Sequence, residues 1–138
     1  MNITEDYCSY EVAKLLKEKG FDWKCLAHWY IDTNKNFAYS NYPQNWNDNT
    51  RVSELEWLSC PTLQMACRWL RETHKLFIEV HIEQGKKVSY KFIIWDFYII
   101  HPNKYVGGTY DFREEQEGFS TPEQAVEAAL KYSLENLI

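Results

Sequence analysis

The chain has 138 residues, of which 45% are hydrophobic and 17% aromatic, and its formal net charge is −5. This length suits a single domain that buries a core without disulfide or metal staples. The acidic balance disfavours a protein that coats DNA or RNA, because such proteins need a basic surface. The N-terminal residues lack a signal-peptide pattern, and no apolar stretch approaches the roughly 18 residues of a membrane span. We therefore expect a cytoplasmic protein whose four cysteines are free thiols.

The first predicted element is an amphipathic helix over residues 10–19. Ser9 suits the N-cap position, and Gly20 suits the left-handed position that ends a helix. Residues 25–31 are rich in apolar and aromatic side chains, which predicts a strand.

Residues 32–49 are rich in Asn, Asp and Pro, which predicts a long loop with at most a brief strand at 37–39. Residues 52–58 fit either a short strand or a helical turn. The region carries four candidate binding residues among its amides: Tyr39, Tyr42, Trp46 and Trp57. Flat rings beside amides suit a small ligand, a nucleotide or a peptide. Rings that fold back over the core as a lid would give the same pattern.

Two further helices are predicted to begin with the same type of residue. Pro61 suits the first turn of a helix over residues 61–74, and Pro122 suits that of a helix over 121–136. Thr121 is a suitable N-cap for the second, with Gln124 completing a capping box.

Between these helices, residues 76–83 and 88–95 alternate with period two, which predicts a β-hairpin. The apolar residues of both strands have even numbers. The numbers of two facing residues must therefore add up to an even number, or the apolar faces of the two strands would not match. A register that pairs Ile82 with Val88 also pairs Glu83 with Lys87 and Glu79 with Lys91, and leaves residues 84–86 as the turn. A charged turn is expected over 113–118, after a further strand at 105–112 that Gly107-Gly108 weakens.

Asp96 is the sharpest anomaly of the hairpin, because it continues the apolar, core-facing set. The same register places it opposite His74, which would form an acid–imidazole pair able to transfer protons. The alternative is a bend or bulge at Trp95-Asp96 that exposes the carboxylate.

Metal and cofactor sites are not expected. Cys60, Cys67 and His74 recur every seven residues, but seven helical residues rise about 10 Å, too far for the ligands of one ion or for a nucleophile and its base. Gly107-Gly108 lacks the lysine and helix start of a phosphate loop.

The residues Pro61-Thr-Leu-Gln-Met-Ala, Arg68-Trp-Leu-Arg-Glu-Thr-His and Glu123-Gln-Ala-Val-Glu-Ala-Ala-Leu-Lys flank the hairpin. This arrangement resembles small uncharacterised proteins of bacterial phages and prophages, as does Tyr10-Glu-Val-Ala-Lys-Leu-Leu-Lys-Glu-Lys-Gly-Phe. The C-terminal half is similar to the phage ABA sandwich domain. The resemblance implies a fold of sheet and helices, and it carries no catalytic residues.

Together these patterns predict a single α+β domain, in which an antiparallel sheet packs against two or three helices. Residues 1–58 would supply a helix, a strand and the long loop, and residues 59–138 a helix–hairpin–helix unit. We expect a non-enzymatic protein-interaction module, encoded by a phage or mobile element, that binds an unknown protein or forms a homodimer. The alternative is a small-ligand or nucleotide-binding module that uses residues 39–57.

Overall fold

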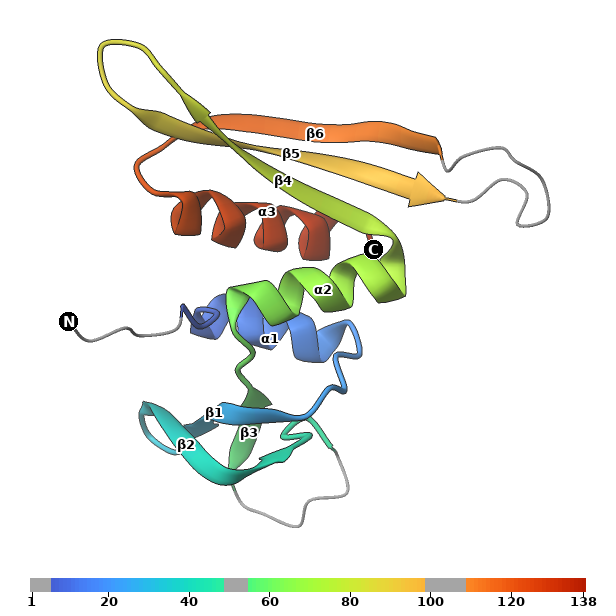
Figure 1. Ribbon diagram of the computed structural model, residues 1–138. Coiled ribbons are helices and arrows are strands. Elements are labelled where there is room, and N and C mark those ends of the chain that lie inside the picture. The colour runs from blue at the N-terminus through green and yellow to red at the C-terminus, as the bar shows by residue number, and fades with distance from the viewer. Residues whose placement is uncertain (1–5, 49–54, 99–108) are drawn as a thin grey trace. The chain divides into compact units, whose positions relative to one another are not determined.

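The computed structural model describes residues 6–48, 55–98 and 109–138 (Figure 1). Within these ranges it has three helices and two three-stranded antiparallel sheets, which confirms the α+β class. The sequence predicted one sheet, but β1 (Cys25–Ile31) pairs only with strands of the N-terminal part and so belongs to a second sheet. The chain divides into two compact units, Met1–Ala66 and Cys67–Ile138, and the boundary falls inside helix α2 (Leu63–His74).

Unit 1 begins with helix α1 (Tyr10–Glu18), close to the predicted bounds. The Ser9 hydroxyl accepts a hydrogen bond from the Val12 N–H at 3.2 Å, which satisfies a donor that the first turn leaves unpaired. Gly20 ends the helix at φ +87°, and the N–H of the buried Phe21 donates to the Leu16 carbonyl at 2.9 Å. The cap residues of the sequence therefore act as predicted.

The long loop predicted over residues 32–49 is wrong over most of its length. Residues Lys35–Gln44 form strand β2, which pairs with β1 through a tight turn. At that turn the Asp32 carboxylate accepts hydrogen bonds from the Asn34 N–H at 2.6 Å and the Asn36 amide at 3.2 Å. The Asn- and Asp-rich composition marks this turn and not a loop, since both residues bond readily to nearby backbone.

Strand β3 (Glu56–Ser59) completes the first sheet in the order β2-β1-β3, so the ambiguous segment ends as a strand. Its first residues, 52–54, lie outside the described ranges. Residues 6 and 7 contact the end of unit 1. Tyr7 forms an isolated β-bridge with Thr62, and the Leu63 N–H donates to the Asp6 carbonyl at 2.8 Å.

Unit 2 consists of the C-terminal part of α2, a second sheet and helix α3 (Pro122–Asn136), which lies along one sheet face (Figure 1). The strands are β4 (Leu76–Glu83), β5 (Ser89–Tyr98) and β6 (Thr109–Phe119), in the order β4-β5-β6. Residues of the inner face and of α3 are fully buried, including Phe92, Ile94, Ala125, Ala129, Leu130 and Leu134. Thr121 caps α3 by accepting from the Gln124 N–H at 3.1 Å, as predicted.

The hairpin of β4 and β5 keeps the predicted even parity but not the predicted register. Ile82 faces Tyr90 instead of Val88, and residues 84–88 form the connection. The predicted facing pairs of Glu83 with Lys87 and Glu79 with Lys91 are therefore wrong. A shift of two residues leaves every side chain on its own face, so periodicity cannot separate the two registers.

Strand β6 replaces the charged turn predicted over residues 113–118, and Gly107-Gly108 lie outside the described ranges. Its charged side chains suit an outer strand of the sheet, where charge discourages pairing with other chains. Gly118 has φ +91°, and the pairing of β5 with β6 shifts by one residue between Tyr90 and Phe92. This is a bulge that uses glycine for its left-handed position.

We expect Gly118→Ala to lower the free energy of unfolding by about 1–2 kcal/mol, because an L side chain at φ +91° is strained even though its Cβ would meet no atom within 4 Å. Gly85→Ala is the matched control, since that glycine has no positive φ and only an ordinary contact with the Lys87 carbonyl. Urea denaturation followed by circular dichroism measures both. Equal stabilities would contradict the bulge.

Candidate functional site

The sheet of unit 2 carries aromatic residues on the face opposite α3, which we call the outer face. Cross-strand pairing places Phe77 beside Trp95 and Trp95 beside Phe112, with Phe97 beside Tyr110 in the next row. Apart from Trp95, which is half-buried, these side chains are 39–62% exposed. The Trp95 ring meets Tyr110 at 5.1 Å and 87°, and Phe112 at 6.0 Å and 81°. Three neighbouring strands therefore build one exposed aromatic surface, because alternate side chains of each strand share a face.

A shallow pocket of about 270 Å³ opens in this surface, lined by Phe77, Glu79, Trp95, Phe97 and Tyr110. The described lining residues are aromatic apart from Glu79, whose carboxylate lies 2.9 Å from the imidazole Nε2 of His81. The hydrogen bond with His81 lowers the pKa of Glu79 below its ordinary value. Glu79 is therefore a carboxylate at neutral pH and keeps its charge further into the acid range than a free glutamate.

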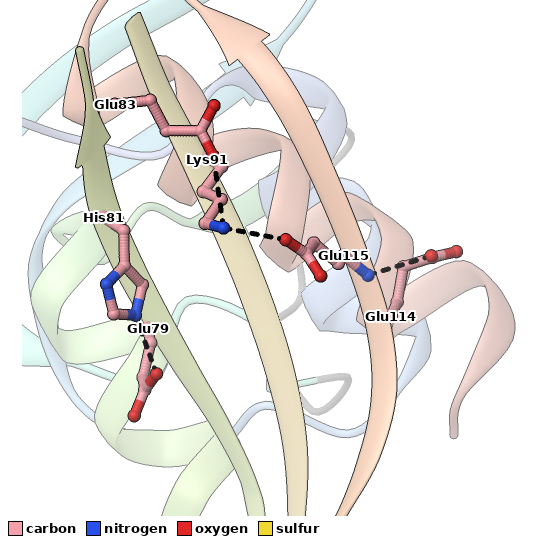
Figure 2. A network of polar contacts seen from close by, with 6 residues as sticks. All are labelled: Glu79, His81, Glu83, Lys91, Glu114 and Glu115. Carbon is pink, nitrogen blue, oxygen red and sulfur yellow. Dashed lines mark hydrogen bonds and ion pairs between the residues drawn. The ribbon is translucent and has the colours of Figure 1, made fainter.

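Next to the aromatic rows the outer face becomes polar (Figure 2). Lys91 on β5 lies between two carboxylates, with Nζ 3.1 Å from Glu83 and 2.9 Å from Glu115. These hydrogen bonds raise the pKa of Lys91, and the one that Lys91 donates to Glu115 has the largest effect. The Glu115 N–H in turn donates to the Glu114 carboxylate at 2.9 Å. The positive charge of Lys91 is balanced by Glu83 and Glu115. Lys91 therefore does not balance the negative charge of Glu79 in the pocket.

The four aromatic candidates of residues 39–57 do not come together in one site. Trp46 is only 6% exposed, and its Nε1 donates to the Cys25 carbonyl at 2.8 Å. Its ring stacks on His28 at 3.8 Å and on the half-buried Trp57 at 5.5 Å. Tyr39 and Tyr42 instead point outward and are 64% and 73% exposed. The interpretation in which rings fold back over the core therefore fits Trp46. Of the four candidates, Tyr39 and Tyr42 are the ones whose rings are exposed for binding.

Asp96 does not face His74, because the corrected register places it opposite Leu76. Its Oδ2 accepts from the Arg113 guanidinium at 2.7 Å, and both side chains are about a third exposed. Arg113 is the extra residue of a second bulge, where the pairing with β6 shifts between Ile94 and Trp95. His74 ends α2 with its ring edge-on to Trp69 at 5.0 Å. The predicted alternative placed a bend or bulge at Trp95-Asp96. A bulge is present nearby, but it lies between Ile94 and Trp95 and its extra residue is on β6.

We expect Asp96→Asn to change the free energy of unfolding by less than about 1 kcal/mol, since partly exposed ion pairs contribute little. Arg113→Gln should have a similar effect, because it removes the same pair from the other side. Urea denaturation in low and high salt measures both. A loss of several kcal/mol would mean that the carboxylate is buried and supports the core.

The four cysteines are free thiols, as predicted, and three of them are buried. Burial raises the pKa of both Cys25 and Cys67 to about 12. For Cys67 the positive charge of Arg71 acts in the opposite direction, but its effect is smaller. The described residues contain no group of three His, Cys, Asp or Glu side chains that would hold a metal ion.

We expect Cys25 and Cys67 to resist modification by a thiol reagent at pH 8, because raising a thiol pKa from 9 to 12 lowers the thiolate population about a thousandfold. Mass spectrometry of the native protein after brief iodoacetamide treatment should find both unmodified, whereas the urea-unfolded protein reacts fully. Rapid native labelling of either residue would contradict the raised pKa values.

The outer face was not identified as a site from the sequence. Its signal was present: the odd positions of residues 76–95 carry Phe77 and Trp95 opposite an apolar set, so both faces of the hairpin hold large apolar side chains. Only one face can meet α3. Phe97 continues the odd set of β5, and the remaining members, Tyr110 and Phe112, lie on β6, whose pairing could not be read from periodicity.

No helix in the described ranges is long and apolar enough to cross a membrane. The resemblance to phage proteins stays a prediction from the residues that carry it. Comparison of the chain with protein-family models, with curated proteins and with solved structures finds no match.

Proposed function

We propose that the protein is a non-enzymatic interaction module that binds a protein partner through the outer face of unit 2. The observation that carries this proposal is the exposure of four large aromatic side chains around Trp95 on one sheet face: Phe77, Phe97, Tyr110 and Phe112. Aromatic residues are enriched at interfaces, where they bury large areas at little entropic cost. Monomers rarely expose such rings side by side without a binding role.

Charge specifies the chemistry of the partner. The chain has a formal net charge of −5, and the described residues that line the pocket in the aromatic surface include a carboxylate and no basic side chain. Opposite charges steer association and suppress wrong partners. The partner therefore presents an apolar segment with at least one cationic side chain.

The origin is also a proposal. A phage or mobile-element origin is supported only by the resemblance in helix starts and core stripes. A second copy of the chain is a less suitable occupant of the outer face, because both faces would carry the Glu79 carboxylate and charge complementarity favours a cationic partner.

The alternative function, a small-ligand or nucleotide-binding module at residues 39–57, keeps one supporting observation. Tyr39 and Tyr42 expose their rings on β2 beside Asn41. Trp46 and Trp57 would take no part, since their rings stack within unit 1.

Two matched double variants separate these proposals. Phe97→Ser with Tyr110→Ser removes two rings of the outer face, and Tyr39→Ser with Tyr42→Ser removes two exposed rings of unit 1. Both should fold, because exposed substitutions usually change stability by about 0.5 kcal/mol or less. A partner captured from bacterial lysate is identified, purified and titrated against wild type and both variants.

We expect the outer-face variant to weaken binding of the purified partner at least tenfold, with the unit 1 variant within about twofold of wild type. The binding should also weaken with salt. The reverse ranking would overturn the proposal and favour the alternative. A concentration-dependent dimer that the outer-face variant abolishes would replace the partner by a second copy.

A further inference from the structure

We infer that the pocket of the outer face binds a methylated ammonium group, presented as a methylated lysine side chain of the protein partner. This inference rests on the proposed function and names the chemical group that the partner inserts. The pocket residues are Phe77, Glu79, Trp95, Phe97 and Tyr110.

The lining of the pocket combines aromatic rings with one carboxylate. The face of an aromatic ring carries negative charge density and attracts a cation within about 6 Å of its centre, and Trp attracts most strongly. The Glu79 carboxylate supplies a negative charge at the same pocket, and none of the described lining residues is basic. A neutral apolar ligand would use the rings and leave this carboxylate facing an apolar group, which is unfavourable.

A second observation is that one ring of this face already lies beside a cation of the chain. The guanidinium carbon of Arg71 lies 5.5 Å from the centre of the Phe77 ring. Phe77 is one wall of the pocket and pairs across the strands with Trp95, its central ring.

The arrangement of the rings favours a rounded cation over a flat one. The Trp95 and Tyr110 planes meet at 87°, so they form a corner and not a pair of parallel plates. A planar guanidinium stacks best on flat faces, whereas methyl groups around a nitrogen can touch two perpendicular walls at once.

Hydration favours methylation for the same site. An unmodified lysine ammonium is compact and strongly hydrated, and it needs hydrogen-bond acceptors when it leaves water. The pocket offers it Glu79 among rings, so most of its N–H groups would lose their partners. Methyl groups remove these donors and keep the charge.

The test uses choline and a short peptide with trimethyllysine as probes on the full chain. Each has a neutral control: the alcohol in which carbon replaces the choline nitrogen, and the peptide with norleucine. Proton–nitrogen correlation NMR follows the Trp95 indole signal during titration. Millimolar binding is expected for choline, with the neutral alcohol at least tenfold weaker.

Matched variants assign the binding to the pocket. Tyr110→Ala and Glu79→Gln should each weaken choline binding about tenfold. Phe112→Ala and Glu83→Gln should stay within twofold, because both residues lie on the same face but do not line the pocket. Circular dichroism checks that each variant is folded.

Several outcomes would overturn the inference: no saturable shift with choline, equal binding of the neutral alcohol, an arginine peptide that binds as tightly as the trimethyllysine peptide, or choline binding without peptide binding. Partner capture separates the two proposals. If Phe97→Ser with Tyr110→Ser loses the partner but choline does not bind, only the inference fails. If choline and the peptide bind while capture is unchanged, only the proposed function fails.

Discussion

Replacing Trp46 with alanine is expected to lower the free energy of unfolding by about 3–5 kcal/mol. The indole is buried, it stacks on His28 at 3.8 Å, and it donates to the Cys25 carbonyl at 2.8 Å. Alanine would leave a cavity in unit 1 and a buried carbonyl without this donor, and both effects add. The measurement is urea denaturation followed by circular dichroism.

Two controls assign this loss to burial. Trp46→Phe keeps a ring but removes the donor, so we expect a smaller loss of about 1–3 kcal/mol. Tyr42→Ala, a few residues earlier and 73% exposed, should change stability by about 0.5 kcal/mol or less. If Trp46→Ala were as stable as Tyr42→Ala, Trp46 would be an exposed binding residue after all.

Replacing Phe92 with alanine is the second large effect, again about 3–5 kcal/mol. Phe92 is fully buried on the inner face, and its ring lies 5.7 Å from that of Phe119. It also faces Val80 across the hairpin, so its loss removes packing from the centre of the sheet. Thermal and urea unfolding should both report the loss.

Phe97→Ala is the matched control, because the two phenylalanines share β5 but lie on opposite faces. Phe97 is 39% exposed, so we expect a change of less than about 1 kcal/mol in stability. The same substitution should weaken partner binding, whereas Phe92→Ala should affect binding only through unfolding. A core-sized stability loss at Phe97 would mean that the outer face is itself covered.

Local signals in the sequence predicted local structure well. Ser9 and Thr121 cap the starts of their helices and Gly20 ends α1, as expected, because a cap satisfies backbone groups within a few residues. The even parity of the hairpin also holds, since it depends only on which face of each strand is apolar.

Non-local features were beyond the same reasoning. The hairpin register depends on the connection at residues 84–88, and two registers of equal parity bury the same side chains. Strand β2 was hidden by Asn and Pro residues, because its partner β1, and not its own composition, holds it extended.

The candidate site shows the same limit. Tyr39, Tyr42, Trp46 and Trp57 are close in sequence, but the fold buries one of them and leaves two outside. The outer face instead gathers residues of three strands, and their proximity exists only once β6 pairs with β5. A site built by strand pairing cannot be read from one segment.

The central claim is that the outer face of unit 2 is where a protein partner binds. Photo-crosslinking in bacterial cells tests it most directly, with benzoylphenylalanine placed at Tyr110 in one variant and at Tyr42 in the other, two residues of similar exposure. The claim predicts a discrete crosslinked partner from position 110, lost when Phe97 is replaced by serine, and none from position 42. A discrete partner from position 42 alone would contradict it.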